Sequence, residues 1–344
     1  MGLGAINIIC ISFFTLEVDR QINTNTNINI KMSTATTFID IPTNHIQTRR
    51  PQSSFKHCIT KGGEFPPEQG RYLLIISLAC PWAHRTYIVR KLKGLESTID
   101  LEIVDYFLGN GGWHFSDRHG STPDVNGFKF LKEYYIKSDP EFSGRITVPV
   151  LWDKKTNQIV NNESSEIIRM FNKEFDEFSS RPGLTFYPDQ HAQAIDEVNS
   201  WIYDNINNGV YKCGFASGQE GYDKAFENLF IHLDKVEEIL SKQAFLVGST
   251  FTEADIRLFT TLIRFDPVYY VHFKTNKRMI KDYPHISKYL RRIYQHSDIK
   301  STVDMFHIKH HYYESHRQIN PLGIVPVGPE LDYLESPIEE KLIF

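Results

Sequence analysis

The sequence has little of what several classes of protein require. Its 344 residues include only four cysteines, too few and too scattered for a disulfide framework or a zinc site. Basic residues number 38 against 42 acidic ones, and this balance provides no basic footprint for nucleic acid. No apolar run approaches the roughly 20 residues of a membrane-spanning helix. We therefore expect a protein of a reducing compartment, with no metal, nucleic-acid or membrane partner.

The first 40 residues differ from the rest of the chain. Residues 3–16 are largely apolar but too short to span a bilayer, and residues 23–29 form an Asn- and Thr-rich tract of low complexity. We expect residues 1–40 to be a disordered or non-native extension of a cytoplasmic protein. A cleaved mitochondrial presequence is the alternative, although Arg20 and Lys31 are the only basic residues before position 40.

Residues 41–180 alternate between strand and helix patterns, which is typical of an α/β domain. Strands are expected at 71–76, 101–107, 147–153 and 158–160, with helices after Pro81 and at 164–171. A long loop, 108–144, contains a short helical piece near 131–135, and loops of this length are usually functional. Pro149 lies inside a strand pattern, where proline is excluded from central ladder positions, so we predict a cis bond after Val148.

From residue 188 to about 330 the pattern is helical. The 3.6-residue period appears at 192–206, 222–241, 252–265 and 286–295, and residues 331–344 are a tail. Thr252 and Asp255 form a capping box at the start of the third helix, which we assign to folding. The predicted architecture is an α/β thioredoxin-like N-terminal domain followed by an all-α C-terminal domain.

Cys80 is the strongest candidate for chemistry. It follows the buried strand 71–76 and precedes Pro81, a residue favoured at the first position of a helix. Free amides and the positive end of the dipole at a helix N-terminus stabilise a thiolate, which is the nucleophilic form of cysteine. The alternative is a buried cysteine acting as a small apolar side chain.

Several longer strings of the chain are distinctive. They are Cys80-Pro81-Trp82-Ala83-His84-Arg85-Thr86, Val148-Pro149-Val150-Leu151-Trp152-Asp153, Asn207-Asn208-Gly209-Val210-Tyr211-Lys212, Arg264-Phe265-Asp266-Pro267-Val268-Tyr269 and His311-Tyr312-Tyr313-Glu314-Ser315-His316, followed by Ile319-Asn320-Pro321. Together with the predicted architecture, these motifs resemble the glutathione transferases. The strings resemble the xi class in particular, which comprises the glutathionyl-hydroquinone reductases, and the resemblance runs from about residue 55 to about 330.

The resemblance implies a two-step reaction. Cys80 attacks the sulfur of a glutathionyl-hydroquinone, releases the hydroquinone and keeps glutathione as a mixed disulfide; a second glutathione then regenerates the thiol. Ala83 stands where a dithiol oxidoreductase has its resolving cysteine, so the second thiol must come from outside the chain.

The resemblance also implies the residues that bind glutathione. The backbone of Val148 would bind its cysteinyl part. Ser164 and free amides at a helix start would bind the γ-glutamyl carboxylate, and Glu163 the ammonium. Arg145 is a candidate for a carboxylate but is equally a surface charge. The complete expected set is Trp113, Arg145, Thr147, Val148, Pro149, Glu163 and Ser164.

On the hydroquinone side, the resemblance implies that Tyr211, Tyr269 and Tyr312 supply phenols. One of them would protonate the leaving carbon and the others would stabilise the thiolate, with the assignment open and Tyr313 as an alternative to Tyr312. A homodimer is implied as well.

Four C-terminal histidines lack the carboxylate or cysteine spacing of a metal site. They are His307, His310, His311 and His316. Two other functions remain open: an omega-like thioltransferase or dehydroascorbate reductase that uses Cys80, and a non-catalytic binding module.

Overall fold

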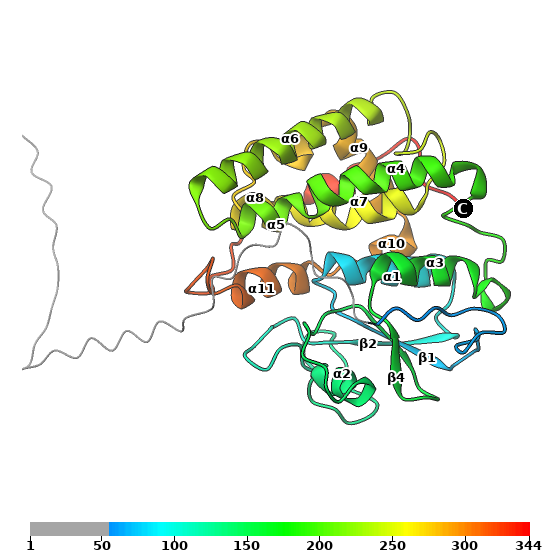
Figure 1. Ribbon diagram of the computed structural model, residues 1–344. Coiled ribbons are helices and arrows are strands. Elements are labelled where there is room, and N and C mark those ends of the chain that lie inside the picture. Colours follow the sequence, from blue (N-terminus) through cyan, green and yellow to red (C-terminus); the bar gives the residue numbers. More distant parts are fainter. Residues whose placement is uncertain (1–54) are drawn as a thin grey trace, which may run out of the picture. The chain divides into compact units, whose positions relative to one another are not determined.

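The computed structural model describes residues 55–344, so the predicted extension 1–40 lies outside the described residues. Its centre is a four-stranded sheet in the order β2-β1-β3-β4 (Figure 1). Strand β1 pairs in parallel with β2 and antiparallel with β3, and β3 pairs antiparallel with β4. The strands are β1 (Tyr72–Ile76), β2 (Ile99–Ile103), β3 (Val150–Asp153) and β4 (Gln158–Asn161). The sequence predicted all four strands, with shifted boundaries.

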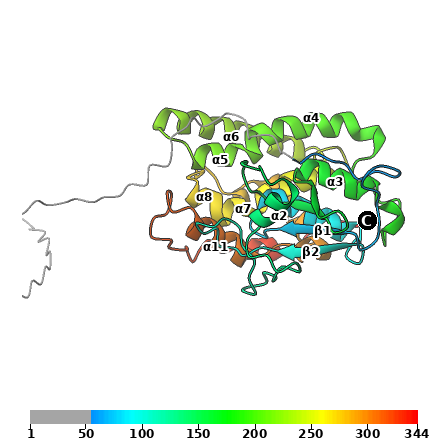
Figure 2. The ribbon, with the colours of Figure 1, turned by 60° about the horizontal axis from the view of Figure 1, so that its bottom comes forward.

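Helices cover both faces of this sheet. Figures 1 and 2 show α1 (Pro81–Leu92) and α3 (Ser164–Lys173) between the sheet and the remaining helices, and α2 (Lys132–Ser138) on the other side. All five residues of β1 are buried, as expected for an apolar strand covered on both faces. Because only residues 77–80 separate β1 from α1, the residue before α1 lies just beyond the C-terminal end of this interior strand.

The chain after residue 190 is helical. The four predicted helices are present, and the sequence analysis did not predict α5, α8, α10 or α11 as separate helices. The elements are α4 (Ala192–Ile202), α5 (Gly209–Gly214), α6 (Gln219–Leu240), α7 (Glu253–Arg264), α8 (Tyr270–His272), α9 (Pro284–Tyr294), α10 (Ser297–Lys300) and α11 (Met305–Ser315).

Helix α7 starts as the sequence predicts, with the capping box of Thr252 and Asp255. Burial raises the pKa of the Asp255 carboxyl to about 6, and Tyr289 Oη donates to it at 3.0 Å. Both residues are buried in the core. The capping box therefore stabilises the fold, as assigned from the sequence.

Two π-helical turns interrupt the helical part of the chain. One, Tyr203–Asn207, separates α4 from α5; the other, Phe265–Tyr269, follows α7. Gly209 starts α5 close to α6, where a Cβ atom would lie 3.3 Å from Leu229 Cδ1. π-Helical turns are rare and occur often at functional sites.

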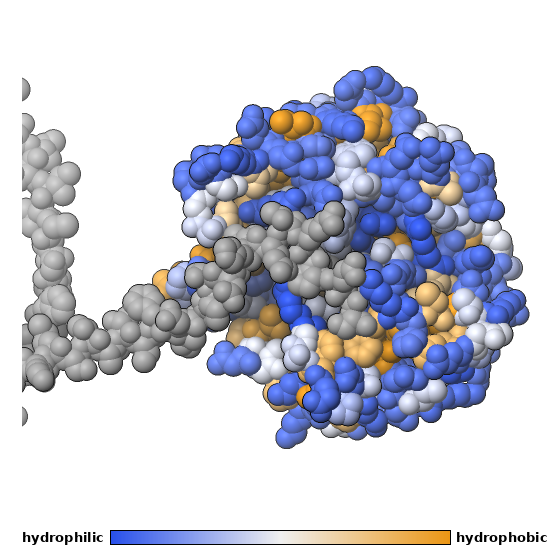
Figure 3. Space-filling model, in the orientation of Figure 1, coloured by the Kyte–Doolittle hydropathy of each residue, from blue (hydrophilic) through white to orange (hydrophobic). Residues whose placement is uncertain are grey.

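The face shown in Figure 3 is mostly hydrophilic, with hydrophobic residues in small groups. No helix within residues 55–344 is long and apolar enough to cross a membrane.

Candidate functional site

Cys80 is the N-cap residue of α1, with extended backbone angles and Pro81 as the first helical residue. Its carbonyl accepts the first bond of the helix, from His84 N at 3.0 Å. Its side chain caps no amide, and the N–H of Ala83 has no acceptor within residues 55–344. An N-cap side chain normally accepts from the second or third helical amide. The thiol is therefore held beside an amide that can donate to a thiolate.

Val148 lies directly against this thiol. Cys80 Sγ is 3.8 Å from the Val148 carbonyl oxygen, within reach of a weak S–H···O bond. The predicted cis bond between Val148 and Pro149 is present, and both residues are buried. The backbone N–H of Val148 donates to no group in the described part of the chain. One extended peptide segment can therefore pair with Val148 within reach of Cys80.

Tyr135 connects the two halves of the predicted glutathione site. Its hydroxyl donates to the Thr147 carbonyl at 2.7 Å and accepts from the Thr147 N–H at 3.2 Å. The side-chain amide of Asn162 donates to the same hydroxyl at 3.2 Å. Because Asn162 directly precedes the start of α3, this tyrosine fixes the Val148 segment relative to that helix. The sequence gives no signal for this role, since a single buried tyrosine resembles ordinary core.

Glu163 and Ser164 open α3, as predicted. Glu163 is the N-cap residue, and its carboxylate accepts from the Ser165 N–H at 3.2 Å and the Ser165 hydroxyl at 3.1 Å. Ser164 is buried, and its hydroxyl lies 3.4 Å from the same carboxylate. The amide of Ser164 has no acceptor within residues 55–344. This helix start offers a hydroxyl and an amide to an anion and a carboxylate to a cation.

The three predicted tyrosines meet in one cluster. Tyr312 Oη, from α11, is 2.5 Å from Tyr211 Oη on α5 and 3.0 Å from Tyr269 Oη in the second π-helical turn. Burial raises the pKa of all three hydroxyls above its usual value, and a charge on Cys80 raises the pKa of Tyr211 and Tyr269 further. The hydroxyls therefore stay protonated at neutral pH, and those of Tyr211 and Tyr269 lie close enough to Cys80 to respond to its charge.

Aromatic side chains pack around Tyr211 in this cluster. Trp82, two residues after Cys80, stacks near Tyr211 with ring centroids 6.5 Å apart. Tyr211 also lies parallel to Phe215 at 6.3 Å and packs against Phe273 at 5.3 Å. Tyr313, the alternative to Tyr312, points elsewhere and donates weakly to the Pro267 carbonyl at 3.4 Å.

Trp113 lies in the long loop after β2 and contacts His311, the neighbour of Tyr312 on α11. Its ring stacks on His311 with centroids 4.9 Å apart, and His311 precedes Tyr312 on α11. His311 Nδ1 lies 2.7 Å from the Tyr106 carbonyl, so it carries the proton. Burial lowers the pKa of His311 to about 3, which keeps the ring neutral. This histidine therefore connects the long loop to the tyrosine cluster.

Other predicted features take no part in this arrangement. Arg145 is exposed and forms no ion pair with the described residues, so its binding role stays a prediction. Among residues 55–344, no three side chains are grouped to hold a metal ion. His307 Nε2 lies 2.5 Å from the His119 carbonyl, and His310 Nδ1 lies 2.5 Å from a Glu314 carboxylate oxygen.

One residue next to Cys80 carries a charge that the sequence analysis did not assign. Arg264, at the end of α7, donates to the carbonyls of Ala79 at 2.8 Å and Leu78 at 2.9 Å. It belongs to the string Arg264-Phe265-Asp266-Pro267, which carries part of the family resemblance. A basic residue at the C-terminal end of a helix is common, so the sequence gives no signal for this role.

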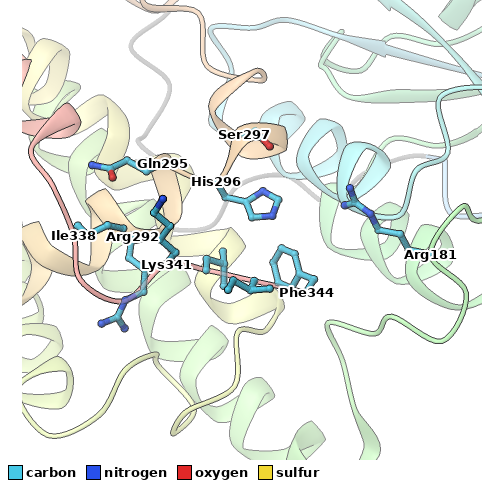
Figure 4. A pocket seen from close by; sticks show the side chains of 10 residues that line it. Arg181, Arg292, Gln295, His296, Ser297, Ile338, Lys341 and Phe344 are labelled. Atoms are coloured by element: carbon cyan, nitrogen blue, oxygen red, sulfur yellow. The ribbon is translucent and has the colours of Figure 1, made fainter.

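A cavity of about 410 Å³ lies away from the Cys80 site (Figure 4). It is near the C-terminal end of α1, where Arg181 donates to the Leu92 carbonyl at 3.0 Å. Two of its cations are paired: Arg181 with Asp298 at 2.6 Å, and Arg292 with Glu340. It contains none of the predicted site residues.

Comparison with known proteins gives consistent matches. The model of the glutathione S-transferase N-terminal domain matches residues 79–174, and that of the C-terminal domain matches residues 219–292. The chain is 48% identical over 311 residues to the glutathionyl-hydroquinone reductase YqjG of Escherichia coli (strain K12), covering 88% of this chain and 94% of the relative.

Two solved structures are also similar. A glutathione-S-transferase Xi from Phanerochaete chrysosporium is 49% identical with a TM-score of 0.81, covering 83% of this chain and 98% of that one. The glutathione-bound structure of YqjG from Escherichia coli K-12 is 50% identical with a TM-score of 0.81, covering 83% of this chain and 95% of that one.

Proposed function

Because this chain belongs to the glutathione transferase family, in its xi class, we propose that it reduces glutathionyl-hydroquinones to hydroquinones at the expense of glutathione. The observation that carries the proposal is the position of Cys80. This thiol lies at a helix N-terminus, against the Val148 carbonyl, with a cluster of tyrosine hydroxyls close enough to respond to its charge.

In the first step, the Cys80 thiolate attacks the glutathione sulfur of the substrate. A new S–S bond forms and the bond from sulfur to the ring carbon breaks, so the electron pair remains on the ring carbon. That carbon takes a proton and leaves as part of the hydroquinone. The thiolate is favoured by the helix N-terminus, where the Ala83 N–H has no other acceptor among the described residues.

In the second step, the thiolate of another glutathione attacks the glutathione sulfur of the mixed disulfide. Oxidised glutathione leaves and the Cys80 thiolate returns, so one glutathionyl-hydroquinone and one glutathione give one hydroquinone and one oxidised glutathione. Ala83 is buried in the first turn of α1 and offers no thiol. Burial raises the pKa of the Cys213 thiol to about 12, so it is a poor nucleophile.

Both steps require glutathione to lie with its sulfur at Cys80. The free N–H of Val148 and its carbonyl pair with the cysteinyl residue of glutathione. Ser164, through its hydroxyl and its amide, binds the γ-glutamyl carboxylate, and Glu163 binds the ammonium. Trp113, Thr147 and Pro149 shape this site, and Arg145 contributes a cation at its exposed border.

Exposure favours one of the three tyrosines as the donor to the leaving carbon. The Tyr312 hydroxyl contacts both other hydroxyls of the cluster. Tyr269 and Tyr312 are buried, whereas Tyr211 is partly exposed and borders Trp82. Tyr211 is therefore the donor, and it recovers its proton through Tyr312.

We further propose a homodimer in the cytoplasm. Leu322, Ile324 and Val327 are strongly exposed apolar side chains in the segment after α11, and a partner subunit would cover them. Light scattering coupled to size-exclusion chromatography tests this proposal: a mass of one chain contradicts it.

The decisive experiment compares three acceptors with glutathione under identical conditions: a glutathionyl-hydroquinone, dehydroascorbate and a small glutathione mixed disulfide. We expect the highest kcat/KM with the glutathionyl-hydroquinone. Faster turnover of either other acceptor supports the omega-like alternative, and no turnover of any acceptor supports a binding module.

A second measurement identifies the thiol. Incubation with oxidised glutathione adds one glutathione at Cys80, detected by peptide mass spectrometry, and Cys80→Ser abolishes both the adduct and turnover without loss of folding. Modification of Cys58 or Cys213 in place of Cys80 would contradict the assignment.

A further inference from the structure

Arg264 is a fully buried cation without an anionic partner in the described part of the chain. Its exposed fraction is 0%, and its guanidinium donates only to neutral acceptors. These are the carbonyls of Ala79, Leu78 and Thr260 and, at 3.0 Å, Nδ1 of His84. A buried charge is costly unless a counter-charge compensates it. The protein therefore keeps a positive charge inside its core that residues 55–344 leave unpaired.

The acceptors of this guanidinium flank Cys80. Leu78 and Ala79 immediately precede it, and His84 lies one helical turn after it on α1. Adjacent Cα atoms are about 3.8 Å apart, so the bond to the Ala79 carbonyl anchors the backbone directly at Cys80. The side chain thus connects the end of α7 to both sides of the thiol.

The charges of Arg264 and Cys80 act on the same hydroxyl. Burial is the largest cause of the raised pKa of Tyr269; the Arg264 charge opposes it, and the Cys80 charge adds to it. Arg264 also opposes the raised pKa of Tyr312, where burial is again the largest cause. A cation and a thiolate that influence one tyrosine in opposite directions lie in the same part of the site.

His84 cannot provide this positive charge. Arginine only donates, so Nδ1 of His84 must accept from Arg264, and Nε2 carries the proton and donates to Thr302 Oγ1 at 2.7 Å. The Thr302 hydroxyl in turn donates to the Ile299 carbonyl at 2.6 Å. Burial and the adjacent guanidinium lower the pKa of His84, so the ring is neutral. Arg264 is the permanent cation of this network.

We propose that Arg264 is a positioning residue for Cys80, holding the backbone before the thiol and the His84 side chain after it, and providing the buried counter-charge for its thiolate. The inference rests on the proposed function in one respect, the assignment of Cys80 as the attacking thiol. It adds a residue of the helical part of the chain to the activation of a nucleophile on the α/β part.

The pH dependence of Cys80 alkylation by iodoacetamide, followed by peptide mass spectrometry, tests this inference. In Arg264→Met, we expect the profile to move about one to two pH units upward, because the opposite charge is lost. Below both midpoints, alkylation then slows about ten- to hundredfold. Arg264→Lys keeps the charge and should restore most of the profile. Arg264→Gln replaces the methionine variant if that variant does not fold.

The titratable groups on the elements packed around the site are unchanged in these variants. Tyr211 and Tyr269 respond to the charge of Cys80. The others are His84 on α1 and His311, Tyr312 and His316 on or beside α11. A profile that stays at the wild-type position in the neutral variants overturns the inference. The inference is also overturned if the alkylation profile of Arg264→Lys is displaced as far as the profiles of the neutral variants.

Arg292→Met is the matched control. Arg292 is also a buried arginine, but it lies on α9 and pairs with Glu340, so its loss should lower stability and leave the alkylation profile unchanged. Alkylation needs no hydroquinone. If wild type reduces no glutathionyl-hydroquinone but the neutral variants still shift the profile, the proposed function fails and the role of Arg264 stands. If wild type is active and the profile does not move, the inference fails alone.

Discussion

The two sides of Cys80 recognise their substrates by different means. On the glutathione side, the groups offered combine backbone atoms at Val148 and Ser164 with the side chains of Glu163 and Ser164 at the start of α3. On the acceptor side they are side chains, the hydroxyls of Tyr211, Tyr269 and Tyr312. A backbone group survives every substitution that preserves the fold, whereas a hydroxyl is lost in one step. Binding of glutathione should therefore be less sensitive to a single substitution than the choice of acceptor.

The largest effect is expected on the acceptor side. Tyr312→Phe removes the hydroxyl that both other tyrosines contact, so the donor can no longer recover its proton. We expect kcat for a glutathionyl-hydroquinone to fall about a hundredfold, the usual size of a general-acid contribution, with KM for glutathione unchanged. Turnover of a glutathione mixed disulfide, which leaves no carbon to protonate, should stay within about threefold, since one disulfide exchange differs little from another.

Tyr313→Phe is the matched control, because Tyr313 is adjacent in sequence, is buried and contacts only backbone carbonyls of the second π-helical turn. An equal loss with both acceptors in Tyr312→Phe would remove the distinction between the two sides.

The next effect concerns acid stability, to which the histidines beside the acceptor side contribute. Burial lowers the pKa of His272 to about 3 and that of His316 to about 4, and the two rings lie 3.2 Å apart, Nε2 to Nδ1. A folded-state pKa below the usual 6.5 means that the unfolded chain binds protons first. This contribution to stability is therefore present at pH 7 and is lost as the pH falls.

Urea unfolding at pH 7 and pH 5 measures this contribution. We expect the fall in unfolding free energy between the two pH values to be about 2 kcal/mol smaller in His272→Gln than in wild type. His285→Gln, at an exposed position of α9, is the control and should behave as wild type. Equal pH dependence in His272→Gln and wild type would show that His272 does not contribute.

On the glutathione side, a smaller effect is expected from Ser164→Ala. One hydroxyl is lost from the anion site while the amide of residue 164 remains, so KM for glutathione should rise about tenfold with kcat nearly unchanged. The factor by which KM for glutathione rises should be the same with a glutathionyl-hydroquinone and with a mixed disulfide as acceptor. A factor that depends on the acceptor would mean that the two sides are not independent.

The smallest effect lies in the sheet that supports the glutathione side. Burial raises the pKa of Glu102 on β2 to about 8, and Tyr134 bridges it to Asp124. A carboxyl with a raised folded-state pKa contributes stability below its usual pKa and loses it as the pH rises toward 8. Its pH dependence is therefore opposite to that of the histidines.

We expect Glu102→Gln to raise the unfolding free energy by about 1 kcal/mol at pH 7.5 and by less at pH 5, measured by urea unfolding. Glu141→Gln, at an exposed position, serves as the control. A destabilised Glu102→Gln variant at pH 7.5 would show that the ionised carboxylate is favoured in the fold.

Much of the fold could be predicted from local pattern. The apolar run 71–76, the proline after Cys80 and the capping box of Thr252 each identify an element from neighbouring residues alone, and each element is present. The cis bond at Pro149 could be predicted because a proline inside a strand pattern leaves few alternatives. Such features depend on interactions within a few residues.

The connections across the site could not be predicted in this way. Tyr135 contacts Thr147 and Asn162, Arg264 contacts Ala79, and His311 stacks on Trp113. Each contact joins residues far apart in the chain, and each residue type has an ordinary role in a core or on a surface. The resemblance implies the three tyrosines, but only the three-dimensional structure brings their hydroxyls into contact and turns Tyr313 away.

The alanine at position 83 determines which oxidised form Cys80 can take. Within residues 55–344 the cysteines are unpaired, and Ala83 gives Cys80 no neighbour with which to close a disulfide. With the proposed chemistry, the resting form after oxidation is a glutathione adduct, whose lifetime is set by the surrounding glutathione concentration. The fraction of molecules that carry this adduct would therefore record how depleted the local glutathione supply is.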